Sequence, residues 1–465
     1  MTTPCLLSEH LTPIADRRSD AVTAALGELE GRPVSWFRLE GGKHRGAIGV
    51  PEGDAIERAV RLGVQLGVPI VGVLASSGAD VTEGVSALHA WGRVAKALSD
   101  ASGVVPTLLG VTGPCVSGPA MLLGLVDQVV MTSDAFAYVS GPETVVAFTG
   151  LEVTRRKLGG ASVHATRSGV AALVVDDDGD VPGALADLLG YLPANHLDDP
   201  PRWRNGDPLG RDTTRAAEAV PAQASAAYDV RIVVTDVLDD GSMLELRPQH
   251  ATNIVTALGR VDGRPVSVVA NQPAQRAGTI DIDAARKAAR FVQWCDAFNL
   301  PLLTFVDTPG FEPGRDLEWR GMIRHGAQLV HAYAAATVPR LCVVLRKAYG
   351  GAYIVMDSRG LGNHWCAAWP RAEIAVIGAR GAVQVLHGRR LAALPEEQRS
   401  EEQAALVADY DRRFANPYVA AERGLVDAVI APLDTRRHVA AALDRLMTLR
   451  EPHPARTAKH SNTPL

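Results

Sequence analysis

Apolar runs of strand length alternate with segments of helical periodicity along most of the chain. In the first half, the pattern predicts strands over residues 34–39, over 68–74 and after Pro106, and helices over 54–66 and 85–98. Residues 21–29, within a polar lead, favour a short helix. Strands and helices alternating at this length indicate crossover units, and therefore an α/β fold with mostly parallel strands.

The second half of the chain repeats this order. It predicts a helix over residues 283–298, a strand over 300–306, a helix over 322–335 and a strand that ends at Gly350. Four landmarks recur at separations of 232 or 233 positions, namely Pro69 and Pro301, Gly78 and Gly310, Pro106 and Pro339, and Gly118 and Gly351. A nearly constant separation indicates duplication of one fold unit.

The two copies are expected to join between residues 182 and 225. This stretch is rich in Pro, Asp, Arg and Ala, lacks a sustained period and is typical of a linker. The expected domains are therefore residues 1–225 and 226–465. Within the second, residues 258–270 predict a hairpin that turns at Asp262-Gly263, and residues 439–449 predict a C-terminal helix.

Two glycine turns follow the longest apolar runs. Residues 341–356 read LCVVLRKAYGGAYIVM, and residues 108–123 read LLGVTGPCVSGPAMLL. In each, a buried strand is expected to lead through small residues into a helix. The first N–H groups of such a helix have no partner within it, so they are suited to hold an anionic oxygen.

Composition narrows the class of protein. The chain has 465 residues, 47% of them hydrophobic, and a formal net charge of −5 with both signs mixed throughout, which argues against binding nucleic acid or a membrane surface. The five cysteines are scattered without a C-x-x-C pair, so neither a metal site nor a disulfide framework is expected. No signal peptide or membrane-spanning run is visible, which favours a soluble, cytoplasmic enzyme.

Several strings resemble one family, the carboxyltransferase β subunits of biotin-dependent acyl-CoA carboxylases, with propionyl-CoA and acetyl-CoA carboxylases of actinobacterial type as the nearest likeness. In the second copy these strings are ANQPAQRAG, FVDTPGFEPG, RKAYGGAYIVM, AWPRAEIAVIGARGAV and NPYVAAERGLVDAVI, and in the first they are GPCVSGPA, SGPETVVAFTGLEVT and LGGASVHATRSGVA. The likeness extends over nearly the whole chain and is strongest from about residue 226.

The resemblance implies two tandem crotonase-like domains, each a spiral of ββα units, and the transfer of a carboxyl group from carboxybiotin to the α-carbon of an acyl-CoA. It implies subunits that pair head to tail, commonly as hexamers, so that each active site combines one N-terminal domain with the partner's C-terminal domain. Neither an ATP-grasp region nor a biotinyl-lysine Met-Lys-Met motif is present. A separate biotin carboxylase and biotin carrier subunit is therefore expected.

The same resemblance assigns roles to individual residues. It places the donors for the biotin oxygen at Gly351 and Ala352, and the donors for the thioester oxygen at Ser117 and Gly118. Pro119, which has no N–H, alters the second pair. The remaining residues expected at the substrate are Gly46, Ser76, Gly78, Gly350, Tyr353 and Ile354.

The first copy departs from the family pattern at two loops. Asp80 stands where an arginine is usual, which places an anion near the expected CoA, and Arg45-Gly46-Ala47-Ile48-Gly49 replaces a Gly-Gly-Ser-Leu-Gly turn. Lys43, His44 and Arg45 are candidate phosphate contacts or simply a solvated basic turn. Ile354 occupies a position that shapes the acyl pocket in the family, and it favours acetyl to butyryl groups over strict propionyl specificity.

Two other functions remain open from the sequence. One is the reverse half-reaction, in which a malonyl- or methylmalonyl-thioester decarboxylase or transcarboxylase uses the same two turns. The other is a non-catalytic assembly paralogue that keeps the biotin-facing half, which the altered loop at Ala75–Asp80 motivates.

Overall fold

The computed structural model describes residues 12–13, 19, 21–42, 44–204 and 206–447. The chain divides into two compact units: the first is Met1–Pro201 with Leu246–His250 and Ala297–Asn299, and the second is the rest of the chain. The expected division at residues 225 and 226 falls inside the second unit, between helices α7 (Thr214–Ala219) and α8 (Val230–Val237).

The first unit is built on a mixed sheet with the strand order β1-β2-β3-β4-β5-β6-β8, and β7 pairs with β5. The two strands at one edge are antiparallel, and every pairing from β3 onward is parallel. The strands are β1 (Thr12–Pro13), β2 (Val22–Leu29), β3 (Arg32–Leu39), β4 (Ile70–Ser76), β5 (Thr107–Val116), β6 (Gln128–Thr132), β7 (Phe136–Tyr138) and β8 (Leu173–Val175).

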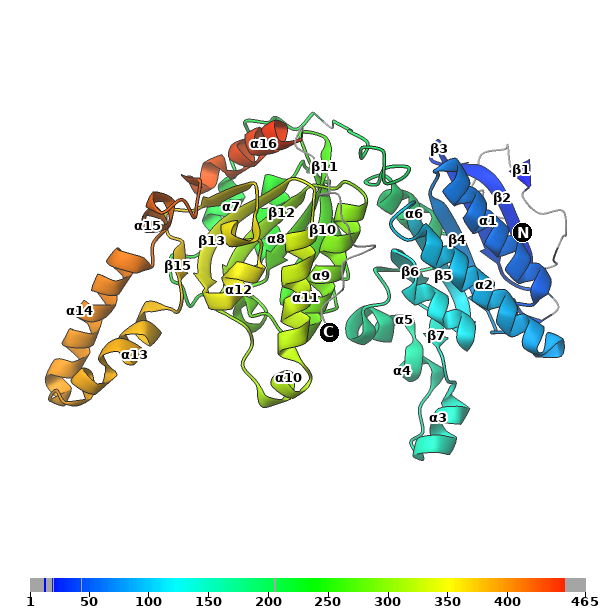
Figure 1. The fold of residues 1–465 in the computed structure, drawn as a ribbon, viewed down its shortest axis with the longest axis horizontal. Helices are drawn as coiled ribbons and strands as arrows, with labels where there is room; N and C mark the ends of the chain where they lie inside the picture. Colours follow the sequence, from blue (N-terminus) through cyan, green and yellow to red (C-terminus); the bar gives the residue numbers. More distant parts are fainter. Residues whose placement is uncertain (1–11, 14–18, 20, 43, 205, 448–465) are drawn as a thin grey trace, which may run out of the picture. The chain divides into compact units, whose positions relative to one another are not determined.

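The helices of the first unit follow the strands as crossover connections (Figure 1). They are α1 (Val50–Leu66), α2 (Val85–Ala101), α3 (Pro142–Thr149), α4 (Arg155–Gly159), α5 (Ala161–Val163) and α6 (Val181–Leu189), with a 3-10 turn η2 (Gly118–Gly124) after β5. The apolar faces of α1 and α2 contribute Ile56, Val60, Val94 and Leu98 to a core shared with the sheet, because their apolar residues recur at helical spacing.

The second unit repeats this arrangement with the strand order β16-β14-β13-β12-β11-β10-β9, and β15 pairs with β13 as β7 pairs with β5. Its strands are β9 (Leu244–Leu246), β10 (Ile254–Val261), β11 (Arg264–Asn271), β12 (Leu302–Thr308), β13 (Arg340–Tyr349), β14 (Trp365–Ala368), β15 (Glu373–Ala375) and β16 (Ala428–Val429). Its further helices are α9 (Ile282–Ala297), α10 (Arg315–Trp319), α11 (Met322–Ala335), α12 (Gly350–Val355), α13 (Ala379–Ala392), α14 (Glu396–Phe414), α15 (Pro417–Glu422) and α16 (Thr435–Leu446). The hairpin of α13 and α14 extends away from the sheet (Figure 1).

The predicted duplication is confirmed down to local irregularities. The pairing of β4 with β5 shifts register between Leu74 and Ser76, and the pairing of β12 with β13 shifts between Val306 and Thr308. The hairpin predicted at Asp262-Gly263 is also confirmed, as the turn between β10 and β11.

Two expectations about elements were wrong. The stretch expected as a helix over residues 21–29 instead forms strand β2 (Val22–Leu29). This strand pairs antiparallel with β3 along its whole length, and the tertiary pairing outweighs its helix-favouring alanines and leucines. Residues 182–225 are not a continuous linker, since α6 begins at Val181 and buries Leu185, Leu188 and Leu189. Pro182 lies in the first turn of this helix, where proline is tolerated.

Two negative findings apply to the part of the chain that the structure describes. None of its helices combines the length and the apolar character needed to cross a bilayer. Within the same residues, no three His, Cys, Asp or Glu side chains come together as a group that could hold a metal ion.

Candidate functional site

The turn between β13 and α12 requires glycine at its first position. Gly350 has φ of 57°, in the left-handed region, and a Cβ atom there would lie 3.0 Å from the carbonyl oxygen of Val376. The backbone N–H groups of Gly351 and Ala352 donate to no acceptor among the described residues. The strand therefore delivers two adjacent, unused donors at the start of α12.

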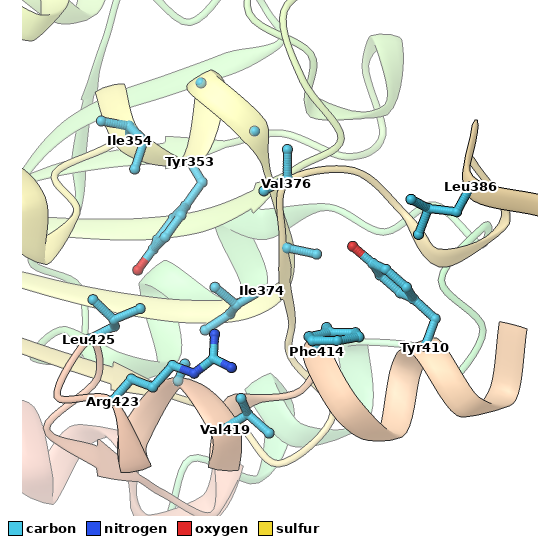
Figure 2. A pocket seen from close by; sticks show the side chains of 14 residues that line it. Tyr353, Ile354, Ile374, Val376, Leu386, Tyr410, Phe414, Val419, Arg423 and Leu425 are labelled. Atoms are coloured by element: carbon cyan, nitrogen blue, oxygen red, sulfur yellow. The ribbon is translucent and has the colours of Figure 1, made fainter. Parts of the chain in front are cut away.

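Gly350 and Gly351 of this turn line a cavity of about 600 Å³ (Figure 2), whereas Ala352 is buried behind them. Its walls are mostly aliphatic and aromatic side chains on or next to α12, β15, α13, α14 and α15. The lining side chains are Tyr353, Ile354, Ile374, Ala375, Val376, Leu386, Tyr410, Phe414, Val419, Ala420, Arg423 and Leu425. Apolar walls around a few fixed donors are typical of a small-molecule site.

Buried polar contacts hold the strand end that leads into this turn. Asp307, at the end of β12, accepts from Arg346 Nε at 3.0 Å and from the backbone N–H of Lys347 at 3.2 Å. Burial raises the pKa of Asp307, and the Arg346 and Lys347 cations oppose that rise. The Tyr349 hydroxyl donates to Glu373 on β15. Asp307 is thus engaged in fixing the backbone and is not a free base.

The other end of α12 is held by a buried ion pair. Arg340 Nη1 lies 2.8 Å from Asp357 Oδ1, and Arg340 Nη2 also donates to the carbonyl oxygen of Leu361 at 3.0 Å. Burial raises the pKa of Asp357 to about 7, against the lowering effect of the Arg340 guanidinium. The second carboxylate oxygen, Asp357 Oδ2, is buried without a hydrogen-bond partner.

The matching turn of the first unit corrects one expected donor. Ser117 has φ of 66°, and its N–H donates to the carbonyl oxygen of Tyr138 at 2.9 Å, so this group is not available to a substrate. The error arose because β7, which supplies that carbonyl, is distant in sequence from the turn. Gly118 keeps an N–H without an acceptor among the described residues, and a Cβ there would lie 2.9 Å from the Trp91 ring.

A second donor in the first unit was missed by sequence reasoning. The Ala79 N–H also has no acceptor among the described residues. Its neighbour Gly78 lies against Ser117, because a Cβ on Gly78 would be 3.2 Å from Ser117 Cβ. The pairing of β4 with β5 brings the loop after β4 to the turn after β5, so Gly118 and Ala79 form the available pair. Only the register of this pairing could have signalled that the free N–H of Ala79 lies close to this turn.

The other residues expected at the thioester side hold the loops together. Ser76 Oγ accepts from the Gly78 N–H at 3.2 Å, and Ser76 is buried. Gly46 has φ of 73°, and a Cβ there would lie only 2.0 Å from the carbonyl oxygen of Ala75. The structure therefore gives Ser76 and Gly46 a supporting position and not an exposed one.

The anion introduced at Asp80 is compensated within the same loops. Asp80 accepts from Thr82 N at 2.9 Å and from Thr82 Oγ1 at 2.7 Å, and its other oxygen lies 2.6 Å from His44 Nδ1. The hydrogen bonds from Thr82 and His44 lower the pKa of Asp80 to about 2. His44 is thus engaged with Asp80, whereas Lys43 lies outside the described residues.

Comparisons with known proteins agree with this geometry. The model of the family described as "Carboxyl transferase domain" matches residues 8–461. The propionyl-CoA carboxylase carboxyltransferase subunit of Haloferax mediterranei is 42% identical over 449 residues, covering 96% of this chain and 86% of the relative. The methylmalonyl-CoA decarboxylase subunit alpha of Veillonella parvula is 39% identical and covers 96% of this chain and 86% of the relative.

A solved structure resembles the whole chain. The crystal structure of the transcarboxylase 12S hexamer, with methylmalonyl-coenzyme A and methylmalonic acid bound, superposes with a TM-score of 0.92 at 39% sequence identity. The match covers 96% of this chain and 85% of that one. The expected fold of two crotonase-like domains is thereby confirmed. The chain belongs to the carboxyltransferase β subunit family of biotin-dependent acyl-CoA carboxylases.

Proposed function

We propose that this subunit takes the carboxyl group of carboxybiotin, borne on a separate carrier protein, and places it on the α-carbon of a short-chain acyl-CoA. The observation that carries the proposal is the pair of adjacent N–H groups at Gly351 and Ala352 that have no acceptor among the described residues, in a turn whose Gly350 and Gly351 line an apolar cavity. Fixed backbone donors stabilise an oxyanion without a titrating side chain.

The two turns have complementary tasks in this reaction. Carboxybiotin supplies the carboxyl group, and Gly351 and Ala352 hold the ureido oxygen on which negative charge develops. In the first unit, Gly118 and Ala79 hold the thioester oxygen, which becomes negative when the α-carbon loses its proton. Charge thus develops where donors already point, which lowers both barriers without reorganisation.

The acyl group is proposed to be short. Ile354 lines the cavity beside Tyr353 and Gly351 and is 42% exposed, so it presents an apolar surface to a bound ligand. An apolar side chain at this position favours acetyl to butyryl groups over a single chain length.

The proposed assembly is a hexamer of head-to-tail dimers that works with a biotin carboxylase and biotin carrier subunit. Large apolar side chains are exposed on both units, including Phe148 at 92%, Leu151 at 70%, Val376 at 82% and Val385 at 78%. Exposed apolar groups of this size are typical of protein interfaces. The transcarboxylase 12S relative is itself a hexamer.

A cytoplasmic location belongs to the same proposal. Cys115, Cys295, Cys342 and Cys366 are buried and free, as is usual in a reducing compartment.

The reverse direction is the second candidate, because relatives of equal coverage include a methylmalonyl-CoA decarboxylase subunit and a transcarboxylase. Both directions use the same oxyanion donors. The direction is therefore a property of the coupled partners and needs a direct assay.

The test is to mix the purified protein with carboxylated biotin carrier and acetyl-, propionyl- or butyryl-CoA, and to measure the carboxylated thioester by mass spectrometry. We expect product with at least one of the three thioesters. A parallel reaction with methylmalonyl-CoA and uncarboxylated carrier measures the reverse direction. Absence of transfer in both directions would identify the chain as a non-catalytic assembly subunit.

A further inference from the structure

Arg423 places an uncompensated positive charge in the apolar cavity beside Gly351. The residue follows helix α15 directly, and its guanidinium points between Leu425, Ile374 and Phe414 (Figure 2). Arg423 has no ion pair and no side-chain hydrogen bond with any residue that the structure describes. It is also the one charged member of the fourteen lining residues.

The surroundings of Arg423 favour a particular kind of ligand. Arg423 is itself exposed, so its guanidinium is open to a ligand that enters the cavity, where an anion would meet a cation framed by aromatic and aliphatic side chains. The planar guanidinium matches a carboxylate through two parallel N–H···O hydrogen bonds. One arginine neutralises one negative charge, so a single carboxylate on an apolar body fits this cavity better than a phosphate.

We infer that Arg423 is the counter-ion for the carboxylate that is being transferred, bound in the cavity that Gly350 and Gly351 border. This inference rests on the proposed function. The carboxylate has two sources with the same chemistry, carboxybiotin before the transfer and the malonyl-type thioester after it. Arg423 is therefore a binding and specificity residue that distinguishes a ligand carrying this group from the same ligand without it.

The experiment compares wild type with Arg423→Gln, Arg423→Lys and the control Arg389→Gln. Arg389 is another exposed arginine, located on α13 outside the cavity. Circular dichroism and thermal unfolding establish that all variants are folded. In the first arm, isothermal titration calorimetry measures the Kd of methylmalonyl-CoA and of propionyl-CoA, which differ by one carboxylate. In the second arm, steady-state kinetics measure the KM for carboxylated carrier in the forward reaction.

We expect Arg423→Gln to raise either the Kd of methylmalonyl-CoA or the KM for carboxylated carrier by about tenfold to a hundredfold. This is the effect of losing one hydrogen bond to a charged group. Weaker binding of methylmalonyl-CoA with unchanged propionyl-CoA binding assigns the carboxylate to the thioester. A raised KM for carboxylated carrier assigns it to carboxybiotin. Arg423→Lys keeps the charge but cannot form two parallel hydrogen bonds, so it is expected to recover part of the lost affinity. Arg389→Gln is expected to match wild type.

Two results would overturn the inference, and they differ. If wild type transfers carboxyl groups and Arg423→Gln equals it in both arms, Arg423 is a solvated surface charge and the proposed function stands. If wild type transfers no carboxyl group to or from any thioester, the proposed function is wrong and this inference falls with it.

Discussion

At the scale of single residues, Gly350 decides the geometry of the turn between β13 and α12. Its φ of 57° and the 3.0 Å approach of the Val376 carbonyl oxygen to a Cβ position both disfavour any side chain. We expect Gly350→Ala to lower the free energy of unfolding by about 1–3 kcal/mol. Gly360→Ala is the matched control, because Gly360 lacks a positive φ and a Cβ there would meet its nearest atom at 3.6 Å. Equal urea unfolding curves for the two variants would show that a side chain at position 350 causes no backbone strain.

A substitution at Ala352 can test whether its backbone N–H is an oxyanion donor. Proline at this position removes the N–H, and the first copy already has Pro119 at the corresponding place in its turn. We expect Ala352→Pro to lower kcat for carboxyl transfer by about 100- to 1000-fold, as for other oxyanion donors. Ala352→Ser keeps the N–H and is expected to stay close to wild type. If Ala352→Pro is folded and fully active, the N–H of Ala352 is not needed for carboxyl transfer.

The sequence predicted some of the candidate site residues and missed others. Gly351 and Ala352 were predicted because the string RKAYGGAYIVM is contiguous, and both N–H groups have no acceptor among the described residues. The prediction of Ser117 as an oxyanion donor was wrong, since its N–H donates to the carbonyl oxygen of Tyr138. Arg423 was missed because nothing in its local sequence indicates that α15 turns it toward a cavity formed by four other elements.

At the scale of elements, helix α12 is held at its C-terminal end by the buried pair of Arg340 and Asp357. Burial raises the pKa of Asp357 to about 7, above the ordinary value of 3.8, so the folded state binds this proton more tightly than the unfolded state does. Stability from this group is fully present below about pH 4 and is lost as the pH rises through 7.

We therefore predict that Asp357→Asn flattens the dependence of stability on pH. The difference in unfolding free energy between pH 5 and pH 8 should shrink by on the order of a few kcal/mol relative to wild type, as measured by urea unfolding. Asp316→Asn is the control, because the side chain of Asp316 is 81% exposed on α10. Identical pH slopes for wild type and Asp357→Asn would contradict the raised pKa.

The elements themselves were predictable where a periodic pattern was long. Helix α11 has the expected bounds, and α9 and α2 differ from expectation by a few residues at their ends. Strand β2 was mistaken for a helix because Ala, Leu and Glu favour helices locally, and its partner β3 lies beyond a turn that local reasoning does not weigh.

At the scale of the whole molecule, the proposed hexamer makes a prediction about mass and surface. We expect the purified protein to have about six times the mass of one 465-residue chain by light scattering. Phe148 on α3 is 92% exposed, and a charge there would disrupt an apolar interface. Phe148→Asp is thus expected to lower the mass without changing the circular dichroism spectrum.

The control for this substitution is Leu66→Asp, at the C-terminal end of α1, where the side chain is 52% exposed. It carries the same charge change on a different helix from Phe148, and it should leave the mass unchanged. A monomeric wild-type protein would contradict the proposed hexamer. An unchanged mass for Phe148→Asp would show that the face around Phe148 is not part of the subunit interface.

The sequence by itself determined the α/β class, the duplication and the turn at Gly350, because each is written in contiguous patterns: periodicity, a constant offset and a glycine pair. The tertiary structure decided which N–H groups are free and which charge lies in the cavity. Those properties depend on partners far away in sequence, such as Tyr138 for Ser117 and the walls from β15 and α14 for Arg423. Hydrogen-bond availability and local charge balance are pairwise quantities, so they exist only once the fold has brought both members together.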